Sequence, residues 1–154
     1  MFTFAQSNGD RVKADAVVLI TSTGCRSAET RTVGTIIDGG FILTVAHGVA
    51  GQTLNQITTA NGTVFEAAIA AIDIDLDLAL LNVEGVTESQ LSAPLRLVAA
   101  KPGERVSFVA FNEQQQFIRD AKIKRRLKIN TQDIYLKNKT SRPGLEVELE
   151  VNVG

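Results

Sequence analysis

The chain has 154 residues, of which 44% are hydrophobic and 21% are charged, and its formal net charge is −1. This composition excludes an intrinsically disordered chain, and no apolar run approaches the roughly 20 residues that a membrane-spanning helix needs. The near-neutral charge gives no overall attraction to nucleic acid or to an anionic membrane. We therefore expect a globular chain, and its length is enough for one good hydrophobic core, with room for part of a second.

The beginning of the chain shows no export signal. Residues 1–14 are largely polar and lack the basic stretch and long apolar run of a signal peptide. We therefore expect either a protein that stays inside the cell or a mature or truncated start. The single cysteine, Cys25, means that no internal disulfide can form.

Six short segments in the first half have the composition and periodicity of β-strands. Gly39-Gly40 and Asn61-Gly62 supply turn signals between them. The alanine-rich residues 67–72 could form a helix by propensity, but their place between the Asn-Gly turn and the next strand favours a strand. Six strands are enough to close a small antiparallel barrel. The expected strands are residues 16–22, 32–38, 41–46, 56–59, 63–72 and 78–83.

The only histidine follows the third of these strands. The largely apolar residues 41–45 lead into Ala46-His47, so the imidazole is expected at a strand end. Imidazole has the side-chain pKa nearest neutrality, which suits a general base. A surface or hydrogen-bonded structural role is the alternative for a lone histidine.

Three aspartates, Asp73, Asp75 and Asp77, alternate directly before the strand at residues 78–83. If that strand begins early, all three side chains lie on one face of it. We expect at least one carboxylate close to the core, where it needs a partner. An imidazole N–H is a suitable one.

Residues 42–47 (ILTVAH) and 77–81 (DLALL), with residues 33–40 (VGTIIDGG) before them, resemble the histidine and aspartate motifs of trypsin-like (chymotrypsin-fold) serine peptidases. The resemblance implies an all-β fold, with a complete six-stranded antiparallel first barrel and an incomplete second barrel. It implies that His47 is the general base. Asp77 would be the orienting acid, because the family's aspartate directly precedes the apolar run, and Asp75 is the fallback. The lack of a cystine fits either a bacterial type or a reducing compartment, and family members are often periplasmic or secreted.

The second half begins with a region rich in proline and glycine. Residues 95–98 interrupt it, residues 105–111 begin a second set of strands, and residues 116–130, 133–137 and 145–151 continue that set. We expect three regions: an N-terminal barrel at 1–84 carrying His47 and Asp77, a linker at 85–103, and a partial C-terminal barrel at 104–154.

A basic run, residues 122–128 (KIKRRLK), stands within this second set. It is read as the solvated face of an edge strand, with an anion or nucleic-acid site as the alternative. No aromatic residues interleave with the basic ones, so we expect no nucleic-acid partner.

The nucleophile expected from the resemblance is missing. The family motif is a Gly-Asp/Asn-Ser-Gly segment, and none of the seven serines stands in one; they are Ser7, Ser22, Ser27, Ser89, Ser92, Ser107 and Ser141. The final residues 151–154 look like the approach to that motif, so we expect a chain truncated just before it and inactive by itself. Cys25 precedes the histidine strand and is disfavoured as a nucleophile. One histidine and one cysteine match no metal-ligand spacing, and we expect no metal or cofactor.

Two functions remain open from the sequence. The first is a trypsin-like serine endopeptidase domain acting on a polypeptide substrate through His47, Asp77 and a serine absent from this chain. The alternative is a non-catalytic pseudopeptidase or peptide-binding β-barrel module. Cleavage specificity and oligomeric state cannot be read from these residues.

Overall fold

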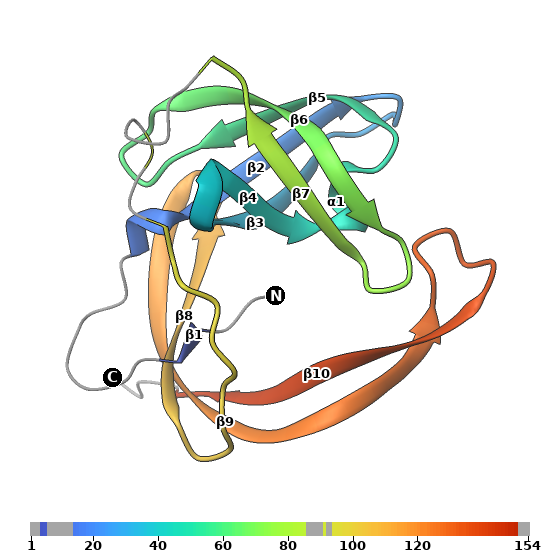
Figure 1. Cartoon of the computed structure of the whole chain (residues 1–154). Coiled ribbons are helices and arrows are strands. Elements are labelled where there is room, and N and C mark those ends of the chain that lie inside the picture. The colour runs from blue at the N-terminus through green and yellow to red at the C-terminus, as the bar shows by residue number, and fades with distance from the viewer. Residues whose placement is uncertain (1–3, 6–13, 86–90, 92–93, 151–154) are drawn as a thin grey trace.

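Six antiparallel strands close into a barrel, as expected (Figure 1). The computed structural model describes residues 4–5, 14–85, 91 and 94–150. Around the barrel the strands follow the order β2-β3-β4-β7-β6-β5. They are β2 (Val17–Gly24), β3 (Thr30–Ile36), β4 (Phe41–Val45), β5 (Gln52–Thr58), β6 (Val64–Asp73) and β7 (Leu78–Val83).

The short connections follow the local sequence. A 3-10 turn, η1 (Ala14–Ala16), precedes β2, and a second, η2 (Asp38–Gly40), joins β3 to β4. Gly39 and Gly40 have φ angles of 83° and 74°, a conformation that glycine adopts at little cost. A single helical turn, α1 (Ala46–Val49), follows β4 directly. Strand β5 begins four residues earlier than the predicted residues 56–59, because Gln52–Asn55 also pair with β2.

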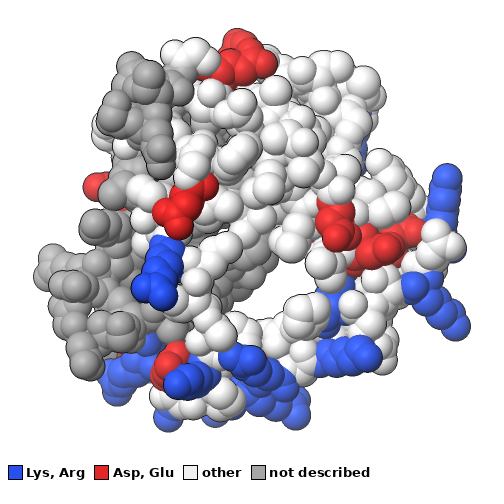
Figure 2. All heavy atoms as spheres, viewed as in Figure 1, with Lys and Arg blue, Asp and Glu red and all other residues white. Residues whose placement is uncertain are grey.

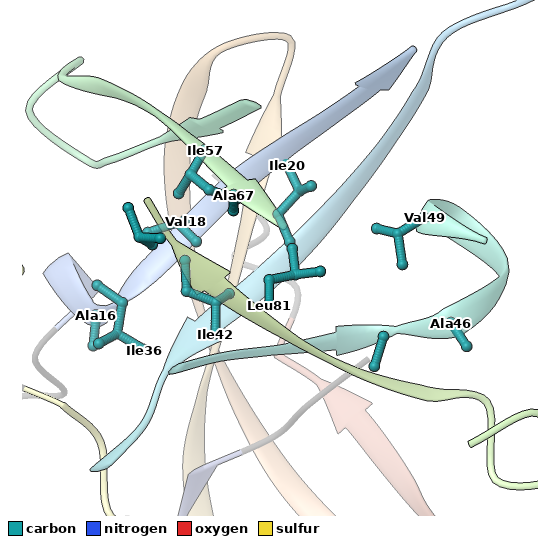
Figure 3. Packing of buried hydrophobic residues seen from close by; sticks show 12 residues of the cluster. Ala16, Val18, Ile20, Ile36, Ile42, Ala46, Val49, Ile57, Ala67 and Leu81 are labelled. Carbon is teal, nitrogen blue, oxygen red and sulfur yellow. The ribbon is translucent and has the colours of Figure 1, made fainter. Parts of the chain in front are cut away.

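The barrel core is built from the inward side chains of the six strands and α1 (Figure 3). Ile20, Ile42 and Leu81 have no exposed surface, and each contributes about 1.5–3 kcal/mol through burial. Figure 3 shows these side chains converging from different strands. Ile42 and Leu81 lie opposite each other in the ladder, so the core packs the paired strands β4 and β7 against the rest of the barrel.

The alanine-rich run is a strand despite its helix propensity. Residues 67–72 lie within β6, which pairs with β5 on one side and β7 on the other. Most β6 side chains are exposed, so packing decides little there. The two ladders of backbone hydrogen bonds override the propensity of alanine.

A second sheet has the strand order β1-β8-β9-β10. Its strands are β1 (Phe4–Ala5), β8 (Arg105–Asn112), β9 (Gln115–Gln132) and β10 (Lys139–Leu149). Strands β9 and β10 form a long curved hairpin whose tip comes back to the β6–β7 turn (Figure 1). Together the closed barrel and the incomplete second sheet confirm the predicted all-β, chymotrypsin-like architecture. Residues 95–98 are not a strand, and the division of the chain at 84 and 104 stays a prediction.

The predicted strand at residues 133–137 is wrong, because these residues form the hairpin turn. Asp133 is 1% exposed, and its carboxylate accepts hydrogen bonds from the backbone N–H groups of Tyr135, Lys137 and Asn138 and from the Asn138 amide. The Lys137 N–H above all, with the other donors, holds the pKa of Asp133 below its usual value against the opposing effect of burial. The turn is thus organised around one buried carboxylate.

The basic run lies on β9 and faces acidic residues of β10. Lys124 pairs with Glu148 at 3.0 Å, and Arg125 pairs with Glu146. Arg126 instead donates to the carbonyl of Ala100 at 2.6 and 3.1 Å. Figure 2 shows Lys and Arg gathered over this hairpin. The acidic partners offset much of the charge that an anion site would need.

Within the described residues, no helix has the length and apolar character needed to cross a membrane.

Candidate active site

The pairing of β4 with β7 brings the histidine and aspartate segments together. Val45, the last residue of β4, lies opposite Leu78, the first residue of β7. His47 comes two residues after Val45, and Asp77 comes one residue before Leu78. Residues 30 positions apart in the chain therefore meet at one end of the barrel.

The carboxylate of Asp77 engages His47 through both oxygens. Oδ2 lies 2.7 Å from His47 Nδ1, and Oδ1 accepts the His47 backbone N–H at 2.8 Å. The Asp77 carbonyl also accepts the Ala46 N–H at 3.1 Å. Asp77 has a φ of 59°, which costs a non-glycine residue on the order of 1 kcal/mol. The hydrogen bonds to Ala46 and His47 offset this cost.

The two side chains differ in exposure. The His47 side chain is 60% exposed, whereas that of Asp77 is 13% exposed. Because an ionised carboxylate only accepts hydrogen bonds, it favours the tautomer that carries the proton on Nδ1. The lone pair then resides on Nε2. The arrangement thus offers an oriented imidazole whose second nitrogen is a proton acceptor.

The helical turn that carries His47 is tied down from β3 and the preceding loop. Thr30 Oγ1 donates to the Gly48 carbonyl at 2.6 Å, and Arg26 donates to the Ala50 carbonyl at 3.2 Å. Gly48 is buried, and a Cβ atom there would lie 2.2 Å from Thr32 Cγ2. Only glycine allows α1 to lie this close to β3.

Strand β7 begins only at Leu78, so the early start that would have placed all three aspartates on one strand face does not occur. Residues 74–77 form a tight turn between β6 and β7, because Asp73 Oδ1 accepts the N–H groups of Asp75 and Leu76 at 3.0 and 2.8 Å. The fallback residue Asp75 takes part through its backbone carbonyl rather than its carboxylate. In the described residues, the side-chain hydrogen bond of His47 goes to Asp77.

Arg142 is a site residue that the sequence reasoning missed. It lies on β10, and its Nη1 is 3.4 Å from Asp77 Oδ2. Its Nε donates to the Asp75 carbonyl at 2.7 Å and its Nη2 to the Gln132 carbonyl at 2.9 Å. No local signal marks this arginine, since 65 residues separate it from Asp77.

The described serines and the cysteine have other surroundings. Ser22 is buried and donates to Asn55 Oδ1 at 2.7 Å. Cys25 is exposed in the loop after β2. Ser27, Ser107 and Ser141 make no hydrogen bond to His47, and Ser7, Ser89 and Ser92 lie outside the described residues.

A cavity of about 290 Å³ opens beside His47, between the barrel and the second sheet. Val17, Thr35 and Val45 line it from the barrel, and Phe108 and Val109 line it from β8. The described residues hold no group of three or more His, Cys, Asp or Glu side chains arranged for a metal ion. Apart from the guanidinium of Arg31 and the imidazole of His47, the lining side chains are apolar or carry a threonine hydroxyl.

Solved structures and a protein-family model are similar to this chain. The Rv3671c protease of Mycobacterium tuberculosis in its active form matches 90% of this chain with a TM-score of 0.75 at 24% identity, and its inactive form matches with a TM-score of 0.69. At this identity the likeness shows a shared fold, and the chain spans 61% and 66% of the length of these two structures. No curated protein matches the sequence. A family model described as trypsin-like peptidase domain matches residues 32–145. The chain therefore belongs to the trypsin-like peptidase domain family.

Proposed function

We propose that this chain is part of a serine endopeptidase that hydrolyses peptide bonds by acyl transfer. The observation that carries the proposal is the contact of 2.7 Å between Asp77 Oδ2 and His47 Nδ1, at the end of the barrel where the His47 side chain is exposed. Family membership supports the same activity. In this proposal, His47 is the general base and Asp77 is the orienting acid.

The first half of the reaction uses the free nitrogen of His47. A serine hydroxyl donates its hydrogen bond to Nε2, and its oxygen attacks the carbonyl carbon of the peptide bond. The proton moves to Nε2, and the carboxylate of Asp77 stabilises the imidazolium. His47 then passes this proton to the leaving amine, which leaves an acyl-serine.

The second half repeats the transfer with water. Nε2 accepts a proton from the water molecule that attacks the acyl carbon, and His47 returns it to the serine oxygen as the acid product leaves. Because Asp77 is mostly buried while His47 is exposed, the base can meet substrate without loss of its orienting partner.

The proposal assigns the nucleophile to a serine outside these 154 residues. The reason lies in the sequence, where none of the seven serines stands in the glycine-flanked motif. That motif also supplies the backbone N–H donors for the oxyanion. We therefore expect the 154-residue chain alone to show no measurable peptidase activity.

The test is labelling by a fluorophosphonate probe, which reacts with an activated serine. The 154-residue chain and the full-length product of the parent gene are compared, together with the full-length variants His47→Ala, Asp77→Asn and Asp75→Asn. We expect labelling of the full-length protein and of Asp75→Asn, and none of the short chain or of His47→Ala. Asp77→Asn is expected to be labelled far more slowly.

The competing function is a non-catalytic peptide-binding module. The cavity beside His47 is the feature that favours it, since uncharged residues line most of its wall. Absence of labelling in a folded full-length protein would overturn the peptidase proposal and leave this alternative. Folding is checked by circular dichroism.

A further inference from the structure

A single arginine of the second sheet joins the β9–β10 hairpin to the candidate catalytic carboxylate. The three nitrogen atoms of the Arg142 guanidinium each meet a different oxygen, on Asp75, Asp77 and Gln132. The side chain is 20% exposed, so water screens these contacts only in part. Arg142 thus contacts the turn before β7 and the end of β9 at once.

The two backbone contacts hold the guanidinium in place. They are 2.7 Å to the Asp75 carbonyl and 2.9 Å to the Gln132 carbonyl, both within the usual range for a hydrogen bond. The contact with Asp77 Oδ2, at 3.4 Å, is longer. The guanidinium is therefore anchored by the backbone and presents its remaining nitrogen to the carboxylate.

The hairpin makes further contacts with the turn that carries Asp77. Asp77 has a left-handed φ of 59°, and the hairpin supplies several bonds to the same turn. The Ile134 N–H donates to the Ile74 carbonyl at 3.2 Å, and Thr140 Oγ1 donates to the Asp75 carbonyl at 3.1 Å. Among these hairpin residues, Arg142 is the one whose contacts reach the Asp77 carboxylate itself.

We propose that Arg142 is a positioning residue that acts through Asp77. It holds the carboxylate in the orientation in which Oδ2 faces His47 Nδ1, and it couples this orientation to the β9–β10 hairpin. The inference rests on the proposed function, because only there is Asp77 the orienting acid. Arginine suits this role better than lysine, whose single ammonium cannot meet three oxygens in the fork geometry of a guanidinium.

Arg142 could also weaken the bond between Asp77 and His47, because both residues contact Oδ2. A cation beside Oδ2 withdraws electron density that would otherwise strengthen the bond to His47. The separations decide between the two effects: Nδ1 lies at 2.7 Å from Oδ2 and Arg142 at 3.4 Å. A carboxylate oxygen also has more than one lone pair, so both donors can be met. Positioning therefore outweighs competition.

The single histidine makes a direct test possible on this chain. In a uniformly ¹⁵N-labelled sample, one imidazole gives the Nδ1 and Nε2 signals, and their shifts report the ratio of the two neutral tautomers. We expect Arg142→Met to lower the ratio of Nδ1–H to Nε2–H about threefold to tenfold, from the loss of one part-buried charged contact. Arg142→Lys is expected to lie between wild type and Arg142→Met.

Two matched variants separate positioning from general stability. Thr140→Val removes a bond to the same Asp75 carbonyl without touching Asp77, and Arg125→Met removes another arginine of the hairpin. Both are expected to keep the wild-type tautomer ratio. If Arg142→Met does not fold, the comparison of Arg142→Lys with Thr140→Val decides in its place.

Two results would overturn the proposal. One is an unchanged tautomer ratio in a folded Arg142→Met or Arg142→Lys protein, which would make Arg142 a structural residue only. The other is a rise in the Nδ1–H tautomer, which would mean that Arg142 competes with His47 for Oδ2. Neither readout depends on a serine, so a failure of the peptidase proposal shows separately as a full-length protein that the fluorophosphonate does not label.

Discussion

Gly48 is the position where the smallest change should move the candidate base. It follows His47 in α1, and a Cβ atom added there would lie 2.2 Å from Thr32 Cγ2. Ordinary carbon contacts begin at about 3.5 Å, so Gly48→Ala must push α1 and β3 apart by roughly 1 Å. Overpacking of this kind costs about 1–3 kcal/mol of unfolding free energy.

The measurement is urea denaturation monitored by circular dichroism, because the chain has no tryptophan whose fluorescence could report unfolding. With an m-value of about 2 kcal/mol/M, a loss of about 2 kcal/mol lowers the unfolding midpoint by about 1 M. The displaced turn should also shift the imidazole signal of His47.

A second substitution tests the cause. Thr32→Ser removes the Cγ2 atom and leaves Cβ and Oγ1 at 3.3 Å from the added Cβ. We expect the double variant Gly48→Ala/Thr32→Ser to recover more than half of the lost stability, with Thr32→Ser alone as the control. An unchanged midpoint in Gly48→Ala, or no recovery in the double variant, would refute the packing argument.

Three further predictions have defined outcomes, and two of them include a control substitution. Asp77→Asn should slow fluorophosphonate labelling of the full-length protein by roughly 10⁴-fold because it favours the wrong tautomer, whereas Asp75→Asn should stay near wild type. Hydrogen bonds lower the pKa of Asp133 in the folded protein. The ionised carboxylate therefore contributes stability above pH 3.8, its usual pKa, and this contribution is lost as the pH falls through the lowered pKa. Asp133→Asn should flatten the dependence of the urea midpoint on pH below about pH 4. Ile42→Ala should lower the free energy of unfolding in urea by about 2–5 kcal/mol, because Ile42 is fully buried. Val64→Ala, at an exposed position, should lower it by less than about 0.5 kcal/mol.

The barrel could be predicted because its signals are local. Alternating side chains, Gly39-Gly40 and Asn61-Gly62 specify strands and turns within a few residues, and six such strands have one simple way to bury their apolar faces. The placement of His47 beside Asp77 came from the motif resemblance, and the register of β4 on β7 gives its physical reason.

The errors arose where side chains bond to the backbone. Ile134 and Tyr135 are residue types that favour strands, but they lie in a turn because the carboxylate of Asp133 accepts backbone N–H groups there. The carboxylate of Asp73 likewise accepts backbone N–H groups in the turn before β7. Composition and period do not reveal such bonds. Arg142 could not be found for a different reason, since its role depends on the curvature of a hairpin far along the chain.

The most direct test of the account is the protonation pattern of the His47 ring in the 154-residue chain. We predict that the neutral ring carries its proton on Nδ1, with a strongly downfield proton signal from the bond to Asp77, and that Asp77→Asn abolishes this signal. A wild-type ring protonated on Nε2, or a signal that survives Asp77→Asn, would contradict the claim that Asp77 orients His47 as a base.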